Sequence, residues 1–175
     1  MARSIYQSAV PPFVAMLTNI KAWLDKAAVQ KDEARLFEAR LSPDMFALAR
    51  QVQIASDSAK STVARITCTD APAMPDTEAS FAELKERCDK TIAYLQSIDP
   101  AALEAGETRA IELKFPNGGG MRFDAMTYLD GFALPNFYFH ASMVYAILRA
   151  EGVGIGKFDF LAHLSPYSFA PPATD

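Results

Sequence analysis

The chain has 175 residues, of which 50% are hydrophobic, and its formal net charge at pH 7 is −4. This size and composition fit one globular domain with a sizeable core, because two independent domains would each be small. The charge balance gives no electrostatic support for binding nucleic acid or an anionic membrane surface. We expect a single domain over residues 1–170 and a frayed tail at residues 171–175.

Cysteine usage and the first residues of the chain predict a cytoplasmic protein. Cys68 and Cys88 are the two cysteines, and they form no CxxC pattern. Both are expected to be free thiols that serve as small buried residues. Residues 1–10 contain no apolar core of the kind that signal peptides have.

The first helix is predicted to start at Tyr6 or at Pro12 and to end at Val29. Its apolar side chains recur at spacings of three and four residues, as in an amphipathic helix, at Phe13, Met16, Ile20, Trp23 and Ala27. The charged residues 31–33 predict a solvated connection. Residues 36–41 fit no single period and suggest a loop that packs through its apolar side chains.

The second helix is predicted to start at residues 42–44 and to run to about Thr67. Ser42 can cap the helix, Pro43 suits the first helical position, and Asp44 favours the positive end of the helix dipole. The apolar stripe consists of Met45, Leu48, Val52, Ala55 and Ala59.

Residues 70–76 have the composition of a linker, and a third helix is expected from about Thr77 to Ile98. Ser80 and Glu83 have the spacing of a capping box. A short helical turn then begins at residues 99–100 and ends near Gly106. Residues 108–123 contain two short strand-like segments around Pro116 and three glycines, which predicts an inserted β-hairpin. Such a hairpin must pack on the helices, because two strands alone are marginally stable.

The fourth helix is predicted from Asp124 to Glu151, with Gly152 as its stop signal. Pro135 lies inside it, and its ring would clash with the carbonyl of Gly131, so we expect a kink there. The tail from residue 157 onward is expected to pack on the body in its first part. Neither the glycines at 118–120 nor those at 152–156 have the context of a phosphate-binding loop.

The uncharged run from residue 131 to residue 148 approaches the lower limit for a membrane span. We reject that interpretation because Pro135, Asn136, His140 and Ser142 are costly in lipid without partners. Such a helix suits the centre of a helical bundle or an interface between copies of the chain.

The candidate site lies on this last helix. Asn136 and His140 are four residues apart, so they share one helical face. His140 is the candidate catalytic base or metal ligand, whereas His163 lies in a tail that nothing places nearby. Two interpretations of the pair stay open. They form a polar spot in a ligand-binding groove, or His140 is a buried histidine bonded to a facing helix.

Gln53 and Asp57 are four residues apart on the second helix, and they are candidate ligand-binding residues. If their face turns inward, they would meet His140, and Asp57 could orient its imidazole. The alternative is a solvated face, because charged residues are mostly exposed. Tyr138 and Tyr145 are candidate wall residues of the same cleft.

Four parts of the chain resemble a bacterial family of unknown function within the DinB/YfiT-like superfamily of metalloenzymes. These parts are residues 48–57, 91–95, 134–140 and much of 146–161, and the LPNFYFH stretch at 134–140 is the most specific. The resemblance implies an all-α, DinB-like four-helix bundle, often a homodimer. It also implies a nickel or zinc site held by a histidine of the second helix and a His-x3-His pair on a later helix.

In this sequence Asn136 and His140 match the spacing of that pair, so His140 alone is kept. The second helix has no histidine, and Gln51 or Gln53 occupies the neighbourhood. The resemblance therefore implies a degraded metal triad, and our leading hypothesis is a small-molecule cleft around Asn136 and His140. One alternative is a transferase or isomerase that uses a thiol cofactor and a divalent metal held by His140. The other is a structural or dimerisation module.

Overall fold

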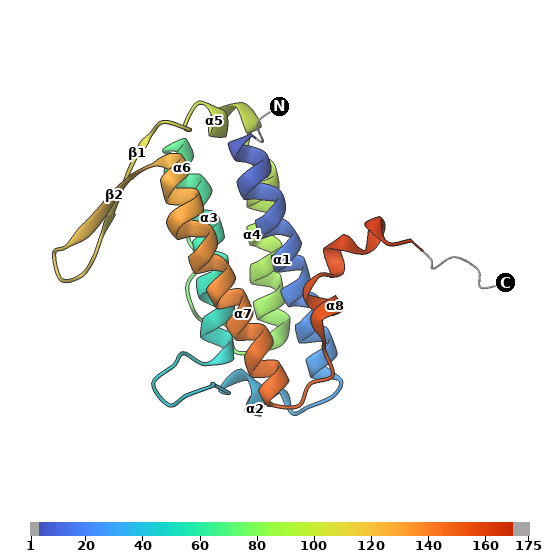
Figure 1. Cartoon of the computed structure of the whole chain (residues 1–175). Coiled ribbons are helices and arrows are strands. Elements are labelled where there is room, and N and C mark those ends of the chain that lie inside the picture. Colours follow the sequence, from blue (N-terminus) through green and yellow to red (C-terminus); the bar gives the residue numbers. More distant parts are fainter. Residues whose placement is uncertain (1–3, 170–175) are drawn as a thin grey trace.

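The computed structural model describes residues 4–169, which are mainly helical with one small antiparallel hairpin (Figure 1). The four long helices lie alongside one another, and they are α1 (Ile5–Ala28), α3 (Leu48–Thr67), α4 (Phe81–Ser97) and α7 (Leu134–Ala150). The short helices within the described residues are α2 (Glu33–Phe37), α5 (Pro100–Glu104), α6 (Ala125–Tyr128) and α8 (Lys157–Phe160). The predicted helical class and hairpin are thus confirmed, and the predicted frayed tail lies outside the described residues.

Helix α1 starts at the earlier of the two predicted positions, so Pro11 and Pro12 both lie inside it. The reason is a cap further upstream, where the hydroxyl of Ser4 accepts a hydrogen bond from the backbone N–H of Gln7. This bond satisfies one of the free N–H groups at the helix end.

The predicted start of the second helix at residues 42–44 is wrong, because α3 begins at Leu48. The hydroxyl of Ser42 bonds to the side chain of Asp44 instead of capping a helix, and residues 42–45 form a turn. The N–H of Leu48 donates to the carbonyl of Ala39 at 2.8 Å, which pins this turn to the end of α2. Part of the connection expected to be irregular is helical, since Asp32 caps α2 through the N–H of Arg35.

Helix α4 starts four residues later than predicted, at the residue after Ser80. The Ser80 hydroxyl accepts from the N–H of Glu83, and the Glu83 carboxylate accepts from the N–H of Ala79. The predicted capping interaction is therefore present in part. In a regular capping box the Glu83 carboxylate would accept from the N–H of Ser80, and here it accepts from the N–H of the preceding residue. The short turn after α4 is helix α5, capped by Asp99.

The hairpin consists of β1 (Ala110–Lys114) and β2 (Gly120–Asp124), with Ala110 opposite Asp124. Ile111 and Leu113 are buried, whereas Ala110, Glu112 and Lys114 are exposed, as expected for a strand with one covered face. Gly118 has φ of +83°, which explains a glycine at this turn position. The strands extend away from one end of the long helices (Figure 1).

The predicted fourth helix is interrupted where Pro135 required a disruption. Helix α6 passes into a π-helical turn at Leu129–Ala133, and the N–H of Leu134 donates to the carbonyl of Leu129, five residues back. This wider turn accommodates the proline, whose ring excludes regular α-helical bonding to Gly131. Gly152 has φ of +77° just after α7, which confirms the predicted stop.

The core lies between the long helices, where Phe13 of α1 packs edge-on against Phe137 of α7 with ring centroids 4.7 Å apart. Helix α8, which follows α7 along the chain, packs back on α1. Phe160 of α8 stacks on Trp23 of α1, with ring centroids 5.4 Å apart. Cys88 is buried as predicted, but the prediction is wrong for Cys68, which is exposed at the left-handed C-terminal cap of α3. Within residues 4–169, no helix has both the length and the apolar character that a membrane crossing needs.

Candidate functional site

His140 lies on the face of α7 that packs against α3, and it is 8% exposed. Its Nδ1 atom is 2.7 Å from Oε1 of Gln51, in the first turn of α3. Gln51 is buried too, and its Nε2 atom donates to the backbone carbonyl of Phe46 at 3.2 Å. The loop before α3, helix α3 and helix α7 therefore meet at one carboxamide.

This chain of bonds determines the protonation of the imidazole. The carbonyl of Phe46 can only accept a hydrogen bond, so the NH2 group of Gln51 must face it. The oxygen of Gln51 then faces His140 and can only accept, which places the hydrogen on Nδ1. No hydrogen bond to Nε2 forms among the described residues. Nε2 therefore carries a lone pair that no donor among residues 4–169 occupies, and the atom is not fully enclosed.

The surroundings of His140 favour this neutral form. Burial lowers the pKa of His140, and the positive charge of nearby Arg50 lowers the pKa further. A depressed pKa keeps the imidazole neutral at pH 7. A neutral imidazole with an unpaired Nε2 can accept a proton or a hydrogen bond from another molecule.

Asn136 lies one helical turn before His140, and its Nδ2 atom donates to the hydroxyl of Ser58 at 3.0 Å. The structure therefore directs both polar residues of this α7 face toward α3, at two different points along it. Tyr138 and Tyr145 share another face of α7, since they are seven residues apart. Tyr145 packs edge-on against Trp23 of α1 at 5.6 Å, and the structure does not bring it to His140.

Gln53 and Asp57 are directed toward α4 and the linker before it, and not toward His140. The Nε2 atom of Gln53 donates to Glu78 at 2.9 Å. Asp57 pairs with Arg87 at 2.7 Å and with Lys60 at 2.9 Å. The imidazole of His140 is oriented by Gln51, and the alternative of Asp57 as its orienting group is not what the structure forms.

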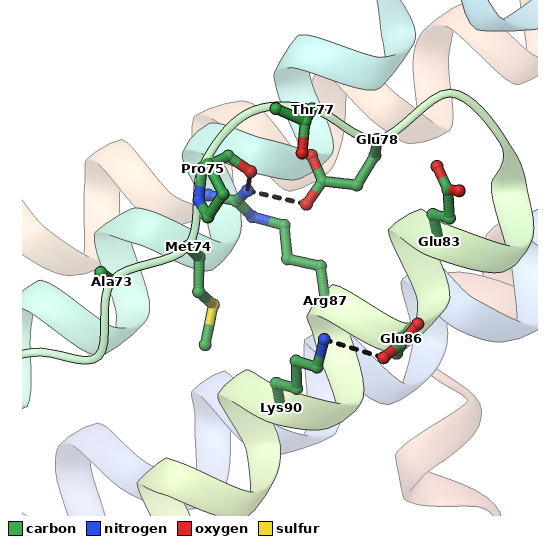
Figure 2. A pocket seen from close by; sticks show the side chains of 9 residues that line it. All are labelled: Ala73, Met74, Pro75, Thr77, Glu78, Glu83, Glu86, Arg87 and Lys90. Carbon is green, nitrogen blue, oxygen red and sulfur yellow. Dashed lines mark hydrogen bonds and ion pairs between the residues drawn. The ribbon is translucent and has the colours of Figure 1, made fainter.

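Arg87 is the centre of this second group, with only 2% of its side chain exposed. Its guanidinium contacts Asp57, Asp76 at 3.1 Å and Glu78 at 2.9 Å. Hydrogen bonds and charge attraction from Glu78 and Asp57 outweigh burial and raise the pKa of Arg87. Figure 2 shows the side chain reaching from α4 to the linker.

A cavity of about 240 Å³ opens beside Arg87. Its wall is formed by the linker and the first turns of α4 (Figure 2), and consists of Ala73, Met74, Pro75, Thr77, Glu78, Glu83, Glu86, Arg87 and Lys90. The cations in this wall already have anionic partners, because Lys90 pairs with Glu86 at 2.8 Å. Gln53 and Asp57 are not among the residues of this wall. Gln53 bonds to Glu78 and Asp57 bonds to Arg87, and both of these partners line the cavity.

The donors around His140 do not fit the metal that the DinB-like resemblance implies. Nδ1 is occupied by Gln51, and Asn136, one turn earlier on the same face, is a carboxamide bonded to the hydroxyl of Ser58. A catalytic zinc takes three imidazole, thiolate or carboxylate ligands, and carboxamides bind such metals poorly. Within residues 4–169, no cluster of three His, Cys, Asp or Glu side chains is placed to hold a metal ion.

Two elements of the site have only weak signals in the sequence. The sequence left Gln51 and Gln53 as two candidates for the position on α3 that faces His140. They lie about 200° apart around the helix, so only one of them can face α7, and periodicity alone does not say which. Arg87 was missed, although the spacing of Leu84, Arg87 and Thr91 places it on the buried side of α4. A buried arginine needs carboxylates to balance its charge. Of the three that pair with Arg87, Asp57 is the one that the sequence indicated.

Residues 5–161 match the family described as a domain of unknown function (DUF1993). None of the curated proteins matches the chain. Among solved structures, the chain is similar to a DinB family member protein from Shewanella denitrificans, with 35% sequence identity and a TM-score of 0.82. That similarity covers 98% of this chain and 95% of the other, so it extends over the whole fold.

Proposed function

The chain belongs to the DUF1993 family and has a DinB-like fold, and from this premise we propose that it binds a small molecule where α3 meets α7. In this proposal α1, α3, α4 and α7 are the four helices of a DinB-like bundle. Asn136 and His140 are the polar anchors of the ligand, and no tightly bound metal is required.

One observation carries the proposal, namely the unpaired Nε2 of a neutral imidazole held in place by Gln51. Fixing both bonds of the Gln51 carboxamide orients the ring before any ligand arrives, which lowers the cost of binding. The ligand therefore presents a hydroxyl, thiol or N–H donor to Nε2. The same atom could act as a general base toward such a group.

Apolar contacts for the ligand come from Phe46 and Phe139. Phe46 is 57% exposed and Phe139 is 52% exposed, and they adjoin Gln51 and His140 respectively. Large exposed aromatic rings beside a polar anchor are typical of ligand walls and interfaces. They would add to the wall for which the sequence suggested Tyr138 and Tyr145, and of these two Tyr145 packs on Trp23 instead.

The test is equilibrium dialysis of the purified chain against a mixture of water-soluble metabolites, with retained compounds measured by mass spectrometry. We expect a compound that the wild type retains and His140→Gln does not. His163→Gln is the matched control, because it removes the other histidine, which lies on the exposed C-terminal segment. Equal retention by all three proteins, or by none, contradicts the proposal.

The metal-dependent alternative is tested by calorimetric titration of the apo protein with Zn²⁺ and with Ni²⁺. We expect no tight stoichiometric binding by the wild type. The double substitution Gln51→His and Asn136→His rebuilds three histidines and serves as the positive comparison. Tight binding by the wild type that is lost in His140→Ala would replace our proposal with the metalloenzyme alternative.

A packing role is the second candidate, because His140 and Asn136 each bond to the facing helix. That role predicts a loss of stability of about 1–3 kcal/mol in His140→Ala, through the buried Gln51 oxygen left without its partner. It also predicts that no compound is retained in the dialysis. The two measurements together separate packing from ligand binding.

A further inference from the structure

A second cavity, of about 500 Å³, lies at the opposite end of α3. Its wall combines the last turns of α3, the residues just after it and the start of β1. Two arginines, Arg65 and Arg109, come from these two parts of the chain and share the cavity. Because α3 rises about 1.5 Å per residue, Cys68 in this wall is about 25 Å from Gln51.

Arg109 is the unusual member of this wall. Its Nε atom is buried, and it has no hydrogen-bond partner among the described residues. No carboxylate within residues 4–169 forms an ion pair with its guanidinium. A buried donor without an acceptor costs about 1–3 kcal/mol, so such a group calls for an external partner.

Close packing places Arg109 at this position. Gly106 lies against the end of α3, where an added Cβ atom would come within 2.1 Å of the carbonyl oxygen of Ile66. The N–H of Arg109 then donates to the carbonyl of Gly106 at 2.9 Å, closing a turn before β1. The arginine is therefore held by backbone contacts and not by a carboxylate.

Arg65 adds a second guanidinium without a carboxylate partner among the described residues. It donates to the hydroxyl of Tyr128 at 3.0 Å and lies 6.0 Å above the centre of that ring. Asp70 and Glu112 are the acidic residues of the wall, and Glu112 is turned toward Arg122 at 3.3 Å. Two guanidinium groups thus remain available to one anion.

We propose that this cavity binds a small molecule through an anionic group, a carboxylate or a phosphate, held by Arg109 and Arg65. Guanidinium groups suit both anions because their paired N–H donors match two oxygens. The volume suffices for a metabolite-sized ligand. This site is separate from the ligand site proposed at His140, so either proposal can fail without the other.

Cys68 supplies a reporter inside the cavity wall. It is the exposed cysteine, whereas burial raises the pKa of Cys88 to about 12 and keeps that thiol unreactive in the folded protein. Neutral iodoacetamide and anionic iodoacetate attack the same thiolate. The ratio of their rates at Cys68 therefore reports the local positive charge, independent of how much thiolate is present.

The experiment measures both alkylation rates by intact-mass spectrometry in the wild type, Arg109→Gln and Arg40→Gln. We expect the iodoacetate-to-iodoacetamide ratio to fall about threefold in Arg109→Gln, from the loss of one charge in the wall that Cys68 shares. Arg40→Gln makes the same change of net charge outside the cavity and should leave the ratio unchanged. Equal ratios in all three proteins would overturn the proposal.

Competition identifies the anion. At constant ionic strength, inorganic phosphate or succinate should slow the iodoacetate reaction of the wild type, with chloride as the reference. Protection by phosphate alone indicates a phosphorylated ligand, and protection by succinate alone indicates a carboxylate. Protection by neither, or protection that persists in Arg109→Gln, contradicts the site. If Arg109→Gln does not fold, as judged by circular dichroism, Arg65→Gln replaces it.

Discussion

The two ends of α3 differ in whether the buried polar atoms nearby have hydrogen-bond partners. At the N-terminal end, Gln51 and Gln53 are buried and each carboxamide has protein partners. At the C-terminal end, Arg109 has a buried nitrogen without a protein partner, and a cavity of about 500 Å³ lies beside it. One helix therefore joins a region closed by its own hydrogen bonds to a region left open.

This contrast separates polar groups that hold the fold from a buried donor that has no partner among the described residues, which is where we propose a ligand. A buried polar group with partners contributes to stability. Its removal leaves those partners buried without a hydrogen bond, which lowers the free energy of unfolding. A buried donor without a partner costs stability, and under our proposal its removal affects binding. His140 belongs to the first kind through Nδ1, which is paired with Gln51, while its Nε2 has no partner among the described residues and is not fully enclosed.

The largest expected effect is at Arg87, in the closed region. Arg87→Gln leaves Glu78 without its countercharge and leaves Asp57 with Lys60 alone, and removal of one partner from a buried ion pair costs about 3–5 kcal/mol. We expect the lower end of that range, about 3 kcal/mol in urea unfolding, since Asp57 is 35% exposed. Arg40→Gln, on the surface, should change stability by less than about 0.5 kcal/mol. Similar unfolding midpoints for both variants would contradict the structural role of Arg87.

The next effect is at Gln51. Gln51→Ala leaves the Nδ1 hydrogen of His140 and the Phe46 carbonyl without partners, so we expect a loss of about 2 kcal/mol. A double-mutant cycle with His140→Ala measures the coupling between the two side chains. Additive losses would show that the hydrogen bond makes no contribution of its own.

The pH dependence of stability sharpens the comparison further. Because folding lowers the pKa of His140 below its usual 6.5, the unfolded chain binds this proton more readily. The stability contribution is therefore complete above about pH 6.5 and is lost as the pH falls toward the folded pKa. Between about pH 7.5 and pH 5.5, the wild type should lose more stability in urea unfolding than His140→Gln. A parallel decline of both proteins would contradict the depressed pKa.

The smallest effect is expected at Arg109, in the open region. Arg109→Gln removes a guanidinium that has no ion-pair or hydrogen-bond partner within residues 4–169, and it relieves the cost of the buried Nε donor, so the variant should be no less stable than the wild type. Measured beside Arg87→Gln in the same urea series, this variant tests whether the buried Arg87 and the half-buried Arg109 have different roles. A loss of about 3 kcal/mol would place Arg109 among the structural groups.

The local signals in the sequence predicted most of the secondary structure. The apolar periodicity located the long helices, Ser80 and Asp99 acted as caps, and Gly152 acted as a stop. Pro135 required an irregular turn, and the structure forms one. The predicted helix start at residues 42–44 is wrong because a side chain bonds to a different partner from the one expected. Ser42 bonds to the side chain of Asp44 instead of capping a helix, and α3 begins at Leu48.

The sequence by itself determined the helical fold, the hairpin and the placement of Asn136 and His140 on one face, because these depend on spacing along the chain. The tertiary structure decided which groups those residues meet. The rotation of α3 against α7 selects Gln51, and not Gln53 or Asp57, as the partner of His140. The close approach of Gly106 to Ile66 brings Arg109 to Arg65 across 44 residues, and no pattern of spacing records such a contact.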